Sequence, residues 1–473
     1  MLNYEDLNFK CGLELHAQLE SSKLFCRCPT VIDNDKPELT IRRKLRSVAG
    51  EAGKKDIATL YEESKDKTFI YEYSNQYGCL VDIDSEPPST MNQEALKIAL
   101  EISLLLNAKI LHKIKVMRKI IIDGSNPSSY QRTTLIAENG HINTSKGKVR
   151  IPAIYLEEDA ARKIKGGKNE ITYRVDRLGF PLIEIATLPD IKDPEHAKET
   201  AELLGIILKS TEKIKVGVGT KRQDINLSIQ NKARIELKGF QNLKDMPKVI
   251  ETEIKRQLDL IKQNRKIEKE VRRVDTDSTT TFLRPLPGKS RFYPDTDLLE
   301  YKISKSLINS IKIPELITEK ALKLEQEFNL TPELAKEIIK KKFPFEKLTK
   351  PYPKISPKLI AQILIEFPKD LKARYNLNYN YKLKDFETVL NLTNKHNLQK
   401  EAILDILQKI AKNQKINLED YEQIPVTKIQ KEIKDIFEKD PNLTPNAIMG
   451  ILMQKYAGKV NPKTIFELIK NTI

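Results

Sequence analysis

Long hydrophobic segments are missing from this chain of 473 residues. The longest apolar run, residues 102–106, is far shorter than the roughly 20 apolar residues that a membrane-spanning helix requires. The first ten residues, MLNYEDLNFK, are acidic and polar and lack the basic and then apolar pattern of a secretory signal. The sequence therefore predicts a cytoplasmic protein that has no membrane partner.

Cysteine is also scarce, with only four residues in the whole chain. Four cysteines are too few for a disulfide framework in a protein of this length. Cys26 and Cys28 are separated by a single residue, and Cys79 or Cys11 could complete a thiolate site for zinc. Reduced cysteines packed in a core explain the same residues equally well, because a C-x-C pair is less diagnostic than C-x-x-C. Zinc is thus one of two open interpretations.

The standard nucleotide-binding motifs are absent too. Neither GEAGKKD (residues 50–56) nor GVGTKRQD (residues 217–224) has the spacing of a Walker A loop. There is also no G-x-S-x-G nucleophile elbow and no dinucleotide fingerprint. The second segment is typical of a turn that brings Lys221 and Arg222 to the start of a strand, where they could contact phosphate. A purely structural turn is an equally good interpretation.

Positive charge is what the chain has in excess. It holds 82 Lys and Arg against 66 Asp and Glu, a formal net charge of +16. A large basic excess favours polyanionic partners such as nucleic acid, although many basic proteins bind none. The 39% hydrophobic and 31% charged content is typical of a globular protein, and the length suits about three domains.

The pattern of elements changes along the chain. Residues 1–290 hold short alternating segments bounded by turn residues, together with two helices that begin near Asn92 and Pro194. This pattern predicts an α+β domain, an antiparallel-sheet cradle. Residues 291–397 and 398–473 have apolar residues at helical spacing and predict two all-α domains, a helical domain and a helical tail domain. Their lysines could form a solvated face or contact phosphates.

One predicted strand raises the question of a site. In GLELHAQLE, residues 12–20, apolar and polar residues alternate strictly. Successive side chains of a strand point to opposite faces, so Glu14, His16 and Gln18 share one face. That row is either wetted by solvent or lines a functional site.

Several other predicted strands have a similar polar face. Each alone is typical of an amphipathic strand with one wet side. Together, on a concave sheet, they could hold a hard divalent cation with phosphates bridged to it. Magnesium takes only one or two carboxylates directly, so most of the acids would support the direct ligands. The residues concerned are Glu14, His16, Glu158, Glu184, Asp224 and Glu236, beside Arg222, Arg234 and Lys238.

Eight long stretches stand out along the chain: GLELHAQL, KLFCRCP, RRKLRSVAGEAGKKD, CLVDIDSEPP, MRKIIIDGSNPSSYQRT, YLEEDAARKI, DRLGFPLIEIATLPDI and RPLPGKSRFYPDTDL. Together they resemble a known family, the B/E subunits of glutamyl-tRNA(Gln) amidotransferases. The wording of the motifs and the lack of a second cysteine pair favour the archaeal E branch. The final run, NAIMGILMQKYAGKVNP, resembles the YqeY-like tail domain of these subunits.

One departure from the E branch is visible. That branch usually carries an inserted domain, similar to one in aspartyl-tRNA synthetases, shortly before RPLPG. Here KRQLDLIKQNRKIEKEVRR runs directly into VDTDSTTTFLRPLPG, which leaves no room for it. The role of that domain in tRNA or partner contact is therefore open for this chain.

The resemblance implies a two-step reaction on glutamate misattached to tRNA(Gln). ATP phosphorylates the side-chain carboxylate, and ammonia then displaces the phosphate to give glutamine. The resemblance further implies that Glu14, His16 and Glu158 hold magnesium, supported by Glu157 and Glu184. A second implied set completes the pocket for ATP or the acyl phosphate: Arg222, Asp224, Glu236 and Lys238.

The resemblance also implies partners. The sequence has no amidase or asparaginase signature, so ammonia would come from an asparaginase-like D subunit. The substrate would be tRNA(Gln) charged with glutamate, gripped by the basic helical domains. Two alternatives stay open at this point. The chain could be a non-catalytic tRNA-binding or docking protein, or a bacterial-type B subunit that works with an amidase partner.

Overall fold

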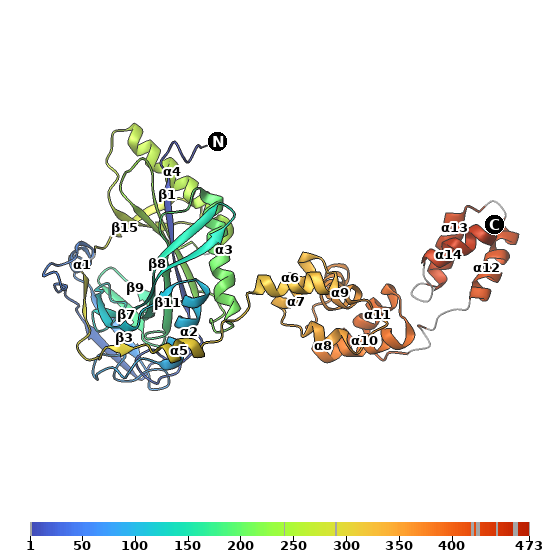
Figure 1. Cartoon of the computed structure of the whole chain (residues 1–473), viewed down its shortest axis with the longest axis horizontal. Coiled ribbons are helices and arrows are strands. Elements are labelled where there is room, and N and C mark those ends of the chain that lie inside the picture. Colours follow the sequence, from blue (N-terminus) through green and yellow to red (C-terminus); the bar gives the residue numbers. More distant parts are fainter. Residues whose placement is uncertain are drawn as a thin grey trace. The chain divides into compact units, whose positions relative to one another are not determined.

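The computed structural model describes residues 2–240, 242–288, 291–417, 421, 426–440, 443–456 and 462–472. The chain divides into two compact units, Met1–Leu316 and Ile317–Ile473 (Figure 1). Among the described residues, no helix combines the length and the apolar character needed to cross a membrane.

The N-terminal unit is built on one large sheet. The strands follow the order β15-β14-β13-β12-β1-β11-β8-β7-β6-β16, and the short β4 (Lys109–Ile110) pairs with β7. The ten strands of this path are β1 (Lys10–Gln18), β6 (Val116–Ile120), β7 (Tyr130–Thr144), β8 (Gly147–Glu158), β11 (Pro181–Ala186), β12 (Lys221–Ser228), β13 (Ile235–Lys238), β14 (Glu270–Val274), β15 (Thr280–Pro285) and β16 (Phe292–Pro294).

The predicted α+β class is confirmed, but the prediction of an antiparallel sheet is wrong in part. Strands β13 and β14 pair in parallel, so the large sheet is mixed. The helix α4 (Met246–Lys262) lies between them in the chain and supplies the crossover that a parallel pair needs. Within the described range 242–288, the chain passes from α4 directly to β14 and β15, so no inserted domain lies between α4 and RPLPG.

The two edges of the large sheet are joined by a very short link. Residues 286–291 connect β15, at one edge, to β16, at the other. Laid flat, ten strands would separate these edges by about 43 Å at the usual strand spacing. A link of this length reaches at most about 25 Å. The sheet must therefore curl, and Pro287 and Arg291 of the link line the cavity on its concave face.

Helices cover the other face of the sheet. The helix α3 (Pro194–Ser210) packs on β1 and β7, and α2 (Gln93–Leu105) packs on β7 and β8 (Figure 1). Asn92 caps the N-terminus of α2 and Asp193 that of α3, so both helices begin near the predicted residues Asn92 and Pro194. The apolar side chains of β1, including Leu13 and Leu15, are buried in this core. The polar row of β1 consequently faces the concave side.

A smaller sheet completes the N-terminal unit. Its strand order is β2-β3-β10-β9, with β3 and β10 parallel, and a two-stranded ribbon pairs β5 with β17. Aromatic side chains such as Tyr71 and Tyr77 form its own core. The remaining elements of the N-terminal unit, including these strands, are β2 (Leu39–Arg43), α1 (Ile57–Glu63), β3 (Thr68–Tyr73), β5 (Lys113–Ile114), β9 (Arg162–Gly166), β10 (Glu170–Arg174), the 3₁₀ helix η1 (Leu243–Asp245), β17 (Tyr301–Lys302) and α5 (Lys305–Ser310).

Helices are the secondary-structure elements of the C-terminal unit, whose described residues contain no strand. Helices α6 to α11 share one apolar core, and α12 to α14 form a separate one. The predicted domain boundaries at residues 290 and 397 and the YqeY-like tail stay predictions, and residues 457–461 of the tail motif lie outside the described ranges. The helices are α6 (Ile317–Phe328), α7 (Pro332–Lys340), α8 (Phe345–Thr349), α9 (Pro357–Tyr375), α10 (Leu383–His396), α11 (Lys400–Ala411), α12 (Val426–Lys439), α13 (Pro445–Tyr456) and α14 (Pro462–Thr472).

Candidate active site

Glu14 and His16 of the polar row of β1 line a cavity of about 750 Å³ on the concave face of the large sheet. The pairing of β1 with its two neighbouring strands decides which side chains surround His16 and Glu14 in this cavity. His16 lies opposite Glu184 of β11 on one side and opposite Arg222 of β12 on the other. Glu14 lies opposite Asp224. Directly opposed residues share a face, so segments distant in sequence deliver charged groups to one cavity.

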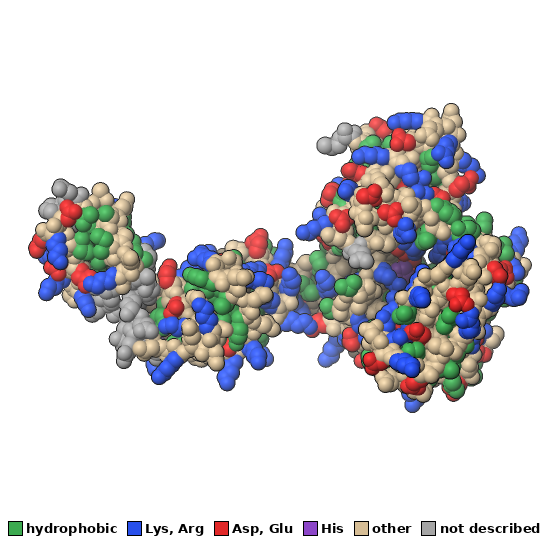
Figure 2. All heavy atoms as spheres, turned by 180° about the vertical axis from the view of Figure 1, so that it is seen from behind, with side chains coloured by type: hydrophobic (Ala, Val, Ile, Leu, Met, Phe, Trp, Pro, Cys, Tyr) green, Lys and Arg blue, Asp and Glu red, His purple; other side chains and the backbone are tan. Residues whose placement is uncertain are grey.

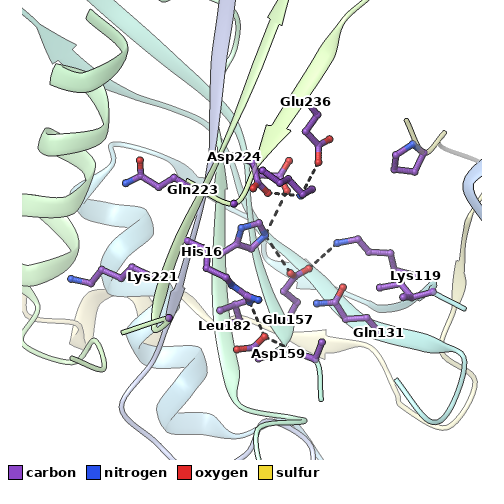
Figure 3. Close-up of a pocket in the computed structure, with 18 of the residues that line it drawn as sticks. His16, Lys119, Gln131, Glu157, Asp159, Leu182, Lys221, Gln223, Asp224 and Glu236 are labelled. Carbon is purple, nitrogen blue, oxygen red and sulfur yellow. Dashed lines mark hydrogen bonds and ion pairs between the residues drawn. The ribbon is translucent and has the colours of Figure 1, made fainter. Parts of the chain in front are cut away.

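His16 is at the centre of a group of carboxylates (Figure 3). Its Nε2 atom lies 3.2 Å from Glu184 Oε2, 3.5 Å from Glu14 Oε1 and 3.8 Å from Glu157 Oε1. One ligand atom each from Glu14, His16 and Glu184 lie within 4.8 Å of one another. This spacing allows the three residues to share one cation.

The electrostatics of this cluster are strongly coupled. Burial alone would lower the pKa of His16, but the hydrogen bond and charge of Glu184, with Glu14 and Glu157, raise it to about 9. Burial and the charge of Glu184 raise the pKa of Glu14 to about 7. Burial opposes ionisation of Glu184, yet Lys119 and His16 together hold its pKa below the ordinary value. A protonated His16 thus offsets part of the negative charge of the carboxylates around it.

Lys119 belongs to this cluster, although the sequence prediction did not include it. Its Nζ atom lies 3.1 Å from Glu157 Oε2 and 3.5 Å from Glu184 Oε2. The strand β6 carries the consecutive cations Arg118 and Lys119, and alternation alone does not tell which of the two faces the cavity. Pairing of β6 with β7 decides it, because Lys119 lies opposite Gln131, another residue of the cavity lining.

Glu158 does not join the expected trio with Glu14 and His16. Alternation along β8 turns Glu157 to the cavity and Glu158 to the opposite face. There Glu158 Oε2 accepts a hydrogen bond of 3.2 Å from the backbone amide of Arg132 and lies 3.6 Å from its guanidinium. The cation-sized cluster in the structure contains Glu184 in place of Glu158.

The second predicted set lies on the same cavity, where its charges pair with one another. Lys238 bridges Asp224 and Glu236, with 2.7 Å between Lys238 Nζ and Glu236 Oε1. Arg222 lies 2.7 Å from Asp159, which also accepts a hydrogen bond from Gln18 of the β1 row. Asp159 was missed in the prediction. The only sequence feature that pointed to Asp159 as a site residue was its place as the third acid of YLEED, directly after β8.

The cysteines form a separate cluster in the N-terminal unit. One atom each from Cys26, Cys28, Cys79 and Asp82 lie within 4.8 Å of one another, whereas Cys11 is buried in the main core. A hydrogen bond with Cys26 lowers the pKa of the Cys79 thiol to about 5. Three thiols and a carboxylate at this spacing suit tetrahedral zinc. Asp82 was not predicted, because no C-x-C pattern points to it.

The fold and the site together define the class of protein: a sheet cradle with a charged, cation-competent cavity, followed by helical segments. The chain belongs to the GatB/GatE family. The GatB/GatE catalytic domain matches residues 9–309, which include every residue of the cavity. The predicted family resemblance is therefore confirmed.

Full-length relatives agree with this assignment. The chain is 32% identical to the E subunit of glutamyl-tRNA(Gln) amidotransferase from Methanocaldococcus jannaschii, an alignment that covers 100% of this chain and 99% of the relative. It is 31% identical to the protein of the same name from Saccharolobus solfataricus, with the same coverage. The first alignment spans 628 positions against 473 residues here, so that relative holds segments this chain lacks. A difference in length of this kind is expected from the predicted lack of the inserted domain in this chain.

Proposed function

We propose that this chain converts glutamate misattached to tRNA(Gln) into glutamine in two steps. The terminal phosphoryl group of ATP is transferred to the side-chain carboxylate, which gives an acyl phosphate and ADP. Ammonia then attacks the acyl carbon, the bond to phosphate breaks, and an amide forms with loss of one proton. A free carboxylate resists attack by ammonia, whereas an acyl phosphate has a good leaving group. The names of the full-length relatives support the substrate and the overall reaction.

The observation that carries this proposal is the convergence of Glu14, His16 and Glu184 on one cation-sized space. Glu14 and Glu184 offer the oxygen ligands that magnesium prefers, and Glu157 lies close enough to support them. His16 is the weaker magnesium ligand by its chemistry and would release its proton when a cation binds. Magnesium bound there would neutralise charge on the phosphates during transfer.

The chain's own residues would position the reactants. Lys119 contacts both Glu157 and Glu184, so it fixes the carboxylates that face the cation. Arg222 and Lys238 lie across the same cavity, where cations would steady the developing negative charge of a transferring phosphoryl group. Their acidic partners hold them in place before the substrate arrives.

The supply of ammonia and the grip on tRNA belong to this proposal as well. We infer that an asparaginase-like partner protein, the D subunit, supplies the ammonia, since the chain carries no amidase or asparaginase signature. Lysine and arginine side chains are spread over the visible faces of both units (Figure 2). Such side chains suit a long polyanion, and we assign tRNA contact to the helical unit.

One incubation tests the function. Glu-tRNA(Gln) is mixed with the purified chain, Mg²⁺, ATP and ammonium, and the esterified amino acid is analysed after hydrolysis. We expect glutamine and a stoichiometric amount of ADP without any partner protein. If glutamate is recovered unchanged and no ADP forms, while tRNA still binds, the chain is a docking protein. In the complete complex, asparagine rather than glutamine should serve as donor; the reverse preference would point to an amidase partner.

A further inference from the structure

The link that joins the two edges of the large sheet begins and ends near an arginine. Arg284 is on β15, and Arg291 directly precedes β16. Both line the main cavity, and both also line a second cavity of about 80 Å³. The short chain connection forces two residues from opposite sheet edges to the same wall of the active-site cavity.

Three other cations of the main cavity are already paired with carboxylates, while Lys221 of the same lining has no ion pair within the described residues. Lys238 bridges two carboxylates, Arg222 contacts Asp159, and Lys119 contacts Glu157 and Glu184. Each of these cations has therefore had much of its charge neutralised before any ligand enters.

Arg284 and Arg291 differ from them. Throughout the described ranges, neither side chain donates a hydrogen bond or forms an ion pair, and the Nε atom of each is buried without a partner. Burying a guanidinium without a partner is costly, and the cost is recovered when an anion binds. Burial and the neighbouring charge of Arg284 lower the pKa of Arg291, against the attraction of Asp56, Glu184 and Glu14.

The acids of the small cavity already have other partners. Asp56 accepts hydrogen bonds from the backbone amides of Ala58 and Gly288, at 2.9 and 2.7 Å. Asp123 accepts from Ser125, and Glu62 from Lys65. None of the three is paired with either arginine in the portion of the chain that the structure describes.

We propose that Arg284 and Arg291 form a phosphate-binding subsite of the cavity. This inference deepens the proposed function and rests on it. A planar guanidinium binds two phosphate oxygens at once, and two of them facing one cavity suit a polyphosphate. The chemistry fits two sources: the phosphates of the nucleotide, or a phosphate of the tRNA acceptor end. The subsite lies beside the acid cluster, so a nucleotide bound there would present its phosphates to the cation.

The experiment compares the full-length chain with Arg284→Gln, Arg291→Gln and the double variant. Arg273→Gln is the matched control, because Arg273 is exposed and paired with Asp275 outside the cavity. Inorganic tripolyphosphate with Mg²⁺ is the probe in thermal unfolding, since it needs neither turnover nor a base. ATP affinity is measured by equilibrium dialysis and tRNA affinity by filter binding.

We expect tripolyphosphate to raise the Tm of the wild type and of Arg273→Gln, and to have no effect on the double variant. The double variant should bind ATP at least tenfold more weakly, about 1.4 kcal/mol. Without ligand its Tm should be equal or higher, because two unpaired like charges are gone. Lysine at both positions keeps the positive charge but loses the planar guanidinium that binds two oxygens. The ATP affinity of this Arg→Lys variant should therefore lie between those of the wild type and the double Gln variant.

An unchanged response of the double variant to tripolyphosphate, ATP and tRNA would overturn the subsite. A loss confined to tRNA affinity would support it, with the acceptor-end phosphate as its source. Failure of the proposed function is distinguishable: the wild type would then form no ADP with Glu-tRNA(Gln), whatever the tripolyphosphate measurement gives.

Discussion

Glu184 Oε2 lies 3.2 Å from His16 Nε2, although 168 residues separate the two in the chain. The register of β1 with β11 places them directly opposite one another. The pair is almost completely enclosed, and Lys119 lies within 3.5 Å of the same carboxylate oxygen. The acidic centre of the cavity is therefore organised around one imidazole.

The pH dependence of stability should report on His16. Its pKa is raised from 6.5 to about 9 in the fold, so the protonated imidazole contributes stability that is fully present below pH 6.5. That contribution is lost as the pH rises through about 9, and amounts to roughly 3 kcal/mol at most. In urea unfolding with EDTA present, the free energy of unfolding of the wild type should exceed that of His16→Gln at pH 6, and the two values should converge near pH 10. A constant difference would contradict the assignment.

Cation affinity should distinguish Glu184 from Glu158. Glu184→Gln removes a carboxylate from the cluster and should weaken Mn²⁺ binding, used in place of Mg²⁺, by at least about tenfold. Calorimetric titration measures this effect. Glu158→Gln is the matched control: it should lower the Tm by breaking the contact with Arg132 and leave Mn²⁺ affinity within about twofold of wild type, under 1 kcal/mol. If Glu158→Gln weakened Mn²⁺ binding and Glu184→Gln did not, the ligands would be the Glu14, His16 and Glu158 expected from the sequence.

The cysteine cluster should contain zinc. We expect about one zinc per purified chain by elemental analysis, since the donor set suits a closed structural site. Cys79→Ser should lose the metal and unfold at a lower temperature. Cys11→Ala leaves the cluster intact and should retain the zinc. Metal-free wild type with an unchanged Tm would return the cysteines to a packing role.

The last three helices should contribute to tRNA affinity. Their core is separate from that of α6 to α11, which includes Tyr421, so truncation after Tyr421 leaves the remaining cores complete. We expect weaker tRNA binding and a shallower dependence of log affinity on log salt, because fewer counterions are released. Filter binding across a salt series measures both quantities. An affinity equal to that of the full chain would mean that the lysines of these helices only face solvent.

Local pattern determined a good part of this protein. The strict alternation of GLELHAQLE put Leu13 and Leu15 in the core and Glu14 and His16 on the cavity face. The α+β class and the family followed from pattern and motif in the same way, because side-chain period and motif wording are both local properties of the chain.

Only the tertiary structure decided which groups meet. Glu157 and Glu158 are neighbours in the sequence and point to opposite faces by strand alternation, but the pairing of β8 with β11 decides which of them faces the cavity. The parallel pairing of β13 with β14, the selection of Lys119 over Arg118, and the meeting of Arg284 with Arg291 across the curled sheet have the same origin. Strand register and sheet curvature arise from contacts between distant segments, and no local pattern encodes them.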